Sequence, residues 1–155
     1  VMLYGNFTAR QNLDFFARLG GKTNLTKNDY YNVMRQVGLQ EEAFERRLKT
    51  FSKGMRQKVG LAIAIIKDAS NIVMDEPTSG LDPKSAAELM QILINLRNEG
   101  KSILMCTHDL FRAKTVADRV GIMKEGRLVM LRTRDEFLQD DLERIYLDYM
   151  QEAIV

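Results

Sequence analysis

The chain has 155 residues, of which 45% are hydrophobic and 28% charged, a composition ordinary for one globular domain or part of one. Its 23 basic and 21 acidic residues are interspersed and give a net charge of +2, so no charge excess points to nucleic acid or an anionic bilayer. The longest apolar stretch, Leu61 to Ile66, is too short to span a membrane, and no secretory signal pattern opens the chain. The single Cys106 cannot form an intrachain disulfide, which favours a reducing, cytoplasmic setting. Because the first residue is Val1 and not Met, we expect a fragment of a longer protein.

The N-terminal third is predicted to be helical. Thr8 with Gln11, and Thr26 with Asp29, have the spacing of capping boxes at the starts of two helices. Glycines end both helices, the first at Gly20-Gly21 and the second at Gly38. A third, short helix is predicted over Glu41 to Arg47.

The central part has the pattern of an α/β fold. Ser52 is the predicted N-cap of an amphipathic helix with apolar positions at 55, 59, 62, 63 and 66. Asn71 to Met74 and Ser102 to Cys106 are predicted to be buried strands, and Asp82-Pro83 starts the helix between them, which ends near Gly100. Alternating helices and continuous apolar strands predict a parallel sheet with helices on both faces.

The C-terminal part is predicted to contain a helix, a hairpin and a helical tail. The helix runs from about Asp109 to Ala117, and the hairpin joins Val120–Met123 to Leu128–Leu131 through the turn at 124–126. The charged tail from Thr133 onward has one apolar stripe, made of Leu142, Ile145, Tyr146 and Tyr149. The predicted organisation is therefore a helical segment, an α/β core and a helical tail, over residues 1–50, 51–132 and 133–155.

Two adjacent carboxylates, Asp75 and Glu76, come directly after the apolar strand and open a loop that contains both prolines of the chain. Adjacent acids at the end of a buried strand are costly unless a cation or a proton transfer uses them. This arrangement predicts a nucleotide hydrolase in which Asp75 holds Mg²⁺ and Glu76 polarises the attacking water. The structural alternative is that both residues only begin a turn.

The segment Phe51-Ser52-Lys53-Gly54-Met55-Arg56-Gln57-Lys58 resembles the signature motif of ATP-binding cassette (ABC) ATPases. Ser52 and Gly54 match the family positions, whereas Lys53 and Met55 replace a Gly and a Gln. A hydroxyl and free backbone N–H groups at a helix N-terminus form an anion site, and Lys53 adds positive charge there. A Ser-x-Gly sequence at a helix start can also be only a cap.

Further motifs follow in the order of the same family. The strand ending in Asp75-Glu76 resembles its Walker B motif, and Ser79-Gly80-Leu81-Asp82 resembles its D-loop, which lies along the nucleotide site of the partner subunit. Asp82 is at the same time the predicted N-cap of the next helix. His108, the only histidine, stands where the switch histidine of the family stands, and the resemblance implies that it contacts the γ-phosphate and positions water with Glu76. Without that context a lone histidine is more often structural.

Gly20-Gly21-Lys22-Thr23 looks like the end of a phosphate-binding P-loop. Phe16 stands where the first glycine of that motif belongs, and the segment follows a predicted helix, whereas a P-loop follows a strand. We therefore interpret these glycines as a helix stop and Lys22 as a residue without a phosphate-binding role.

From Leu3 to Phe137 the chain is similar to the C-terminal two-thirds of an ABC nucleotide-binding domain of the export-type branch, without the P-loop (Walker A) segment. The resemblance implies a partial P-loop NTPase-type sheet, ATP and Mg²⁺ as cofactors, a second nucleotide-binding domain and an integral membrane permease as partners, and no nucleic acid. It also implies a cytoplasmic protein, peripheral on the inner face of the membrane, whose helical segment before Ser52 touches the permease.

The leading hypothesis is thus an ATPase subunit that couples ATP hydrolysis to substrate export, present here as an N-terminally truncated chain that is inactive alone. The alternative is a shortened regulatory cassette that pairs with an intact one and does not hydrolyse ATP by itself. A third is a non-transport cassette acting on DNA or ribosomes, which would usually carry a coiled-coil insertion or a tandem cassette.

Overall fold

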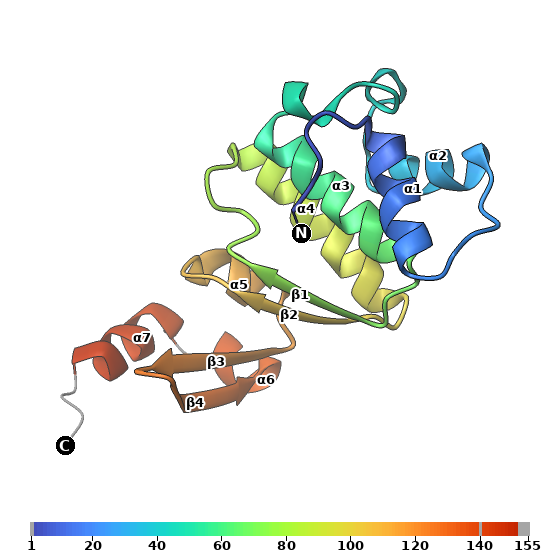
Figure 1. Cartoon of the computed structure of the whole chain (residues 1–155). Helices are drawn as coiled ribbons and strands as arrows, with labels where there is room; N and C mark the ends of the chain where they lie inside the picture. Colours follow the sequence, from blue (N-terminus) through green and yellow to red (C-terminus); the bar gives the residue numbers. More distant parts are fainter. Residues whose placement is uncertain (1, 140, 152–155) are drawn as a thin grey trace. The chain divides into compact units, whose positions relative to one another are not determined.

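The computed structural model describes residues 2–139 and 141–151, which form two compact units (Figure 1). The first unit extends to Met105 and the second begins at Cys106, and each is described by itself. The division predicted from the sequence, at residues 50 and 132, remains a prediction. No helix of the described residues is long and apolar enough to cross a membrane.

The first unit begins with two helices, α1 (Ala9–Leu19) and α2 (Lys27–Gln36). Both predicted capping boxes are confirmed, with Thr8 accepting from the N–H of Gln11 and Thr26 from that of Asp29. After α1 the N–H of Gly21 donates to Arg18 and that of Lys22 to Ala17, and Gly21 has φ +82°, so this segment ends a helix. The interpretation of these glycines as a helix stop is confirmed.

The predicted helix from Glu41 to Arg47 is wrong. The chain forms instead two short 3₁₀ turns, η1 (Glu41–Ala43) and η2 (Leu48–Thr50). The carbonyl oxygens of Phe44 and Arg46 accept hydrogen bonds from the backbone of Arg10 and Ala9 at the start of α1. Because these acceptors bond to α1, the segment between η1 and η2 does not continue as a helix; it forms turns, and Arg47 pairs with Thr8 as an isolated β-bridge.

Glu45, in the turn between η1 and η2, joins α1 to α2. Its carboxylate accepts from Arg10 Nε at 2.7 Å and from the Tyr31 hydroxyl at 2.9 Å, and Lys27 Nζ lies 3.8 Å away. Burial alone would raise the pKa of Glu45, but these hydrogen bonds and the two positive charges together hold it below its ordinary value.

We expect this carboxylate to make stability depend on pH. Since the pKa of Glu45 is lower in the folded protein, its contribution to stability is complete above the unfolded pKa and is lost as the pH falls below it and through the folded pKa. Urea unfolding across this range should show a smaller pH-dependent loss for Glu45→Gln than for the unchanged chain. Parallel pH profiles would contradict the assignment, and the difference should shrink in high salt because the side chain is partly exposed.

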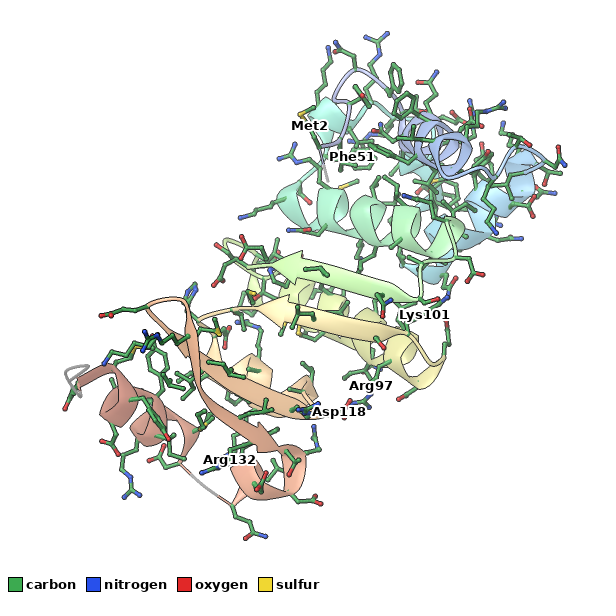
Figure 2. The ribbon with its side chains drawn as sticks, turned by 60° about the horizontal axis from the view of Figure 1, so that its bottom comes forward. Met2, Phe51, Arg97, Lys101, Asp118 and Arg132 are labelled. Atoms are coloured by element: carbon green, nitrogen blue, oxygen red, sulfur yellow. The ribbon has the colours of Figure 1, made fainter. Side chains whose placement is uncertain are left out.

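Helix α3 (Lys53–Ile66) is the centre of the first unit, and α1, α2 and α4 (Pro83–Asn98) all pack against it. Ser52 is its N-cap, as predicted, and Phe51 is buried just before its start (Figure 2). The helices bury an apolar core between them, which includes Leu13, Ala17, Met34, Val59, Ala62, Leu89, Leu93 and Leu96. This core fixes the direction of α3 and therefore where its N-terminus lies.

The strands β1 (Asn71–Asp75) and β2 (Ser102–Cys106) pair in a two-stranded parallel sheet, with α3 and α4 on one side (Figure 1). The predicted α/β class is confirmed. Burial is more one-sided than the continuous apolar runs predicted, because Ile72 is 8% exposed whereas Val73 is 74% and Leu104 63% exposed. Successive strand residues point to opposite faces, and only the face towards the helices is covered within this unit.

The second unit contains α5 (Leu110–Val116), the hairpin of β3 (Arg119–Lys124) and β4 (Arg127–Thr133), α6 (Arg134–Leu138) and α7 (Leu142–Gln151). The predicted hairpin is confirmed as an antiparallel pair. Its core is formed by Ile122, Met130, Phe137 and Leu142, and the predicted stripe of the tail, Ile145, Tyr146 and Tyr149, packs against it. The Lys124 ammonium donates to the carbonyl of Tyr149 at 2.8 Å and so ties α7 to the hairpin turn.

Candidate functional site

The acidic loop begins where β1 ends. Asp75 is exposed at the last position of the strand, and Glu76 is half-buried at the first position of the turn. The N–H of Ser79 donates to the Glu76 carbonyl at 3.1 Å and closes this turn. Glu76 has φ +44°, a left-handed conformation that costs a residue with a side chain roughly 1–2 kcal/mol. Strain of this kind gathers at functional sites, where the surrounding structure imposes it.

The N-terminus of α3 is the second part of the site. The N–H of Met55 donates to the Ser52 hydroxyl at 3.2 Å, so Ser52 caps the N-terminus of α3. Ser52 and Lys53 are exposed and Gly54 is half-buried. The arrangement combines a helix N-terminus, a hydroxyl and an ammonium group, all of which favour an anion.

The structure places the starts of α3 and α4 against each other. A Cβ atom on Gly54 would lie 3.3 Å from the side chain of Ser85, a close approach that would require Ser85 to shift by a few tenths of an ångström. The Lys53 ammonium lies 3.3 Å from the place that a Cβ on Gly80 would occupy. The signature-like segment and the D-loop-like segment, predicted separately from the sequence, are thus neighbours.

Asp82 fixes the start of α4. Its carboxylate accepts from the Ser85 hydroxyl at 2.6 Å and from the Ser85 N–H at 2.9 Å, which confirms the predicted cap. These two hydrogen bonds hold the pKa of Asp82 below its ordinary value, so the cap is charged at neutral pH.

A groove of about 750 Å³ in the first unit is lined from both sides by candidate residues. Lys53 and Arg56 line it from α3, and Asp75 and Pro77 line it from the end of β1. Cationic groups and a strand-end carboxylate therefore border one cavity.

Magnesium usually keeps several waters and binds one or two carboxylates together with phosphate oxygens. The described residues contain no group of three or more His, Cys, Asp or Glu side chains placed to hold a metal ion. A single exposed carboxylate at Asp75 fits the magnesium pattern and does not fit a metal site built by the protein alone.

His108 belongs to the second unit, where it lies exposed between β2 and α5. Next to it, Asp109 caps α5 by accepting from the N–H of Arg112 at 3.0 Å. Burial would raise the pKa of Asp109, but its hydrogen bonds with Arg112 and nearby positive charge hold it below the ordinary value. His108 therefore belongs to a different unit from the other candidate residues, which all lie in the first unit: Ser52, Lys53, Gly54, Asp75, Glu76, Ser79, Gly80 and Asp82. Their roles stay predictions.

Sequence reasoning missed Ser85, Lys58 and Glu88. Ser85 stands three residues after the N-cap Asp82. This spacing could have identified it as the residue whose backbone N–H donates to the capping carboxylate. Lys58 lies inside the quoted signature segment, but nothing in the sequence pairs it with Glu88, 30 residues later.

A family model described as "AAA domain, putative AbiEii toxin, Type IV TA system" matches residues 10–111, more than half of the chain. The fluoroquinolones export ATP-binding protein of Mycobacterium tuberculosis (strain CDC 1551 / Oshkosh) is 34% identical over 148 residues, which cover 94% of this chain and 48% of that protein. The lantibiotic transport ATP-binding protein SrtF of Streptococcus pyogenes is 31% identical over 144 residues, covering 93% of this chain and 60% of that protein. The chain belongs to the AAA-domain family as an ATP-binding cassette. This cassette chain spans about half the length of the curated relatives it matches.

Solved structures agree on the fold of the cassette. A dimeric ATP-binding cassette in a post-hydrolysis state with ADP and Pi superimposes with a TM-score of 0.74 at 23% identity, over 85% of this chain and 59% of that one. The ATP-binding subunit of an ABC transporter gives a TM-score of 0.76 at 26% identity, over 97% of this chain and 65% of that one. The fold class and the family expected from the signature-like and acidic segments are thereby confirmed.

Proposed function

We propose that the chain is the signature-bearing part of the ATP-binding subunit of an ABC exporter, which couples ATP hydrolysis to export through a separate membrane permease. The observation that carries the proposal is the contact between the N-terminus of α3 and the start of α4, beside the acidic end of β1. Lys53 from the start of α3 and the Asp75 carboxylate at the end of β1 then border one groove. Relatives named for fluoroquinolone export and lantibiotic transport support the export assignment.

Each candidate residue has a role in this proposal. Asp75 would hold Mg²⁺, which neutralises phosphate charge when bound. Glu76 accepts a proton from the attacking water, and His108 helps to position that water and the γ-phosphate. The anion-binding and loop residues, which shape and line the nucleotide site, are Ser52, Lys53, Gly54, Ser79, Gly80 and Asp82.

The proposed partners are a second nucleotide-binding domain and a permease. Ser52 and Gly54 provide one set of phosphate contacts, and a P-loop of the partner cassette provides the other, so ATP binds between two cassettes. Gly21 and Lys22 end α1 and provide no such cradle, so the 155-residue chain alone is proposed to be inactive. The working site is cytoplasmic, at the inner face of the membrane, and nucleic acid is not a partner.

The test is Mg²⁺-dependent phosphate release by the natural complex of this protein with its permease in lipid vesicles. Hydrolysis that disappears on addition of EDTA and requires the permease-bound assembly supports the exporter, and absence of any ATP hydrolysis contradicts it. The alternative, a shortened regulatory cassette, predicts that the chain pairs with an intact cassette and that hydrolysis does not depend on Glu76 of this chain.

A further inference from the structure

Lys58 connects three helices of the first unit. It belongs to α3, and its ammonium group donates to the carbonyl of Gly38 at the end of α2 at 3.0 Å and to Glu88 Oε2 on α4 at 2.8 Å. Its side chain is only 13% exposed, which is unusual for a lysine and shows that the position is packed. The hydrogen bond from Lys58 is the largest cause of a lowered pKa at Glu88, so the carboxylate is charged opposite the ammonium.

The Lys58–Glu88 pair adds a contact between α3 and α4 to the close approach of Gly54 and Ser85. Gly54 and Lys58 are four residues apart and share a face of α3, whereas Ser85 and Glu88 are three apart and share a face of α4. Gly54 faces Ser85, and about one helical turn further on Lys58 faces Glu88. Two consecutive contacts fix both the distance between the helices and their register along the axis.

The hydrogen bond from Lys58 to the carbonyl of Gly38 connects the end of α2 to the α3–α4 pair. Gly38 has φ +66° and follows the end of α2, where the N–H of Gly38 donates to Arg35 and that of Leu39 to Met34. Its carbonyl lies at the negative end of the helix dipole, where a cation is favoured. Lys58 therefore ties the end of α2 to both helices whose N-termini form the candidate site.

We propose that Lys58 is a positioning residue that holds the Ser52–Gly54 segment in register with the Ser79–Asp82 loop and transmits the position of α2 to both. The inference rests on the proposed function, because the two segments matter together only if they serve one nucleotide. Lys58 does not touch the nucleotide. Its loss lets the N-terminus of α3 move relative to that of α4, so that contacts to phosphate no longer form together.

The first test needs no nucleotide and uses the 155-residue chain. Amide hydrogen exchange is measured at the capped N–H groups of Met55 and Ser85, which report the starts of α3 and α4. In Lys58→Met, which keeps the aliphatic stem and removes the ammonium, both amides should exchange about tenfold faster. Unchanged exchange at both amides would overturn the inference, whatever the hydrolysis assay shows.

Lys101→Met is the matched control. Lys101 also forms an ion pair at 2.7 Å, with Asp68, and its side chain is 20% exposed. It lies at the start of β2 (Figure 2), and its partner Asp68 follows the C-terminal end of α3. We expect this variant to leave exchange at Met55 and Ser85 unchanged. If both variants accelerated exchange at Met55 and Ser85 equally, the cause would be a general loss of stability of the first unit, which would contradict a positioning role for Lys58.

The second test separates positioning from stability in the permease complex. Lys58→Met should lower kcat about tenfold with the KM for ATP changed less than about twofold, because the partner P-loop holds most of the ground-state phosphate contacts. Lys58→Arg, which retains a charged donor, should recover most of kcat. A fall in kcat that Arg does not rescue, or one that Lys101→Met reproduces, would overturn the inference.

Two further variants divide the contacts of Lys58. Glu88→Ala removes the α4 contact but keeps the bond to Gly38, and it serves if Lys58→Met does not fold. The double reversal Lys58→Glu with Glu88→Lys restores an ion pair between α3 and α4 but places a carboxylate beside the carbonyl of Gly38. We expect partial recovery of kcat in the reversal, and no recovery would contradict the register argument. A wild-type complex without ATP hydrolysis would refute the proposed function, whereas the exchange experiment would still decide the inference.

Discussion

Glu76→Gln is expected to lower the rate of ATP hydrolysis by the natural transporter complex by about 100-fold or more, while ATP binding persists. The amide keeps the size of the side chain and the left-handed backbone, but it cannot accept the proton of the attacking water. The loss should therefore appear in kcat and leave the KM for ATP nearly unchanged. Phosphate release under saturating ATP measures kcat, and filter binding of labelled ATP measures affinity.

Glu125→Gln is the matched control, because Glu125 is also a glutamate with a left-handed backbone, at φ +47°. It is exposed in the turn between β3 and β4, and the same chemical change there should retain the full rate. If Glu76→Gln hydrolysed ATP at the wild-type rate, the base would lie elsewhere, and the regulatory alternative for this chain would be favoured. A loss of ATP binding together with hydrolysis would show that the loop itself had rearranged.

Asn12→Leu is expected to reduce the free energy of unfolding by about 2–4 kcal/mol. Asn12 is fully buried in α1, where its Oδ1 accepts from the N–H of Tyr4 at 2.9 Å and its Nδ2 donates to the carbonyls of Tyr4 and Thr8 at 3.1 and 2.9 Å. Leucine fills a similar volume but leaves the Tyr4 backbone groups without these partners. Tyr4 would also lose its fixed place against Phe15, whose ring centroid is 4.9 Å away.

Urea unfolding of both proteins gives the difference, and Asn95→Leu is its control. Asn95 is exposed on α4, and its side chain accepts a hydrogen bond from Gln91 in the same helix, so its replacement should change stability by less than about 0.5 kcal/mol. Similar losses for the two variants would mean that the buried hydrogen bonds of Asn12 contribute little beyond helix propensity.

The parts of the fold that could be predicted from the sequence are those decided by neighbouring residues. Thr8, Thr26, Ser52 and Asp82 mark helix starts because each cap needs only the three residues that follow it. The segment from 41 to 47 was mispredicted since its backbone carbonyls bond to α1, more than thirty residues earlier. No local pattern contains that information.

The candidate site shows the same division. The order and spacing of the motifs indicated the residues of the family, and the comparisons confirm the family. The contact of Gly54 with Ser85 could not be derived, because it depends on how two helices pack. The hydrogen bonds of Lys58 to Gly38 and Glu88 could not be predicted either. A lysine on a helix normally extends into water, and the sequence of α3 does not indicate which residues of other elements accept from it.

The left-handed backbone at Glu76 has a consequence for the history of the sequence. Glycine adopts this conformation without strain, so a Glu76→Gly substitution would relieve the turn while deleting the carboxylate. Selection for thermal stability alone would therefore push this position towards glycine. If Glu76 is the proton acceptor proposed above, a sequence that keeps glutamate here retains a less stable loop for the sake of hydrolysis. Variants selected in the laboratory for heat resistance should then be checked first for a substitution at position 76 and for loss of ATP hydrolysis.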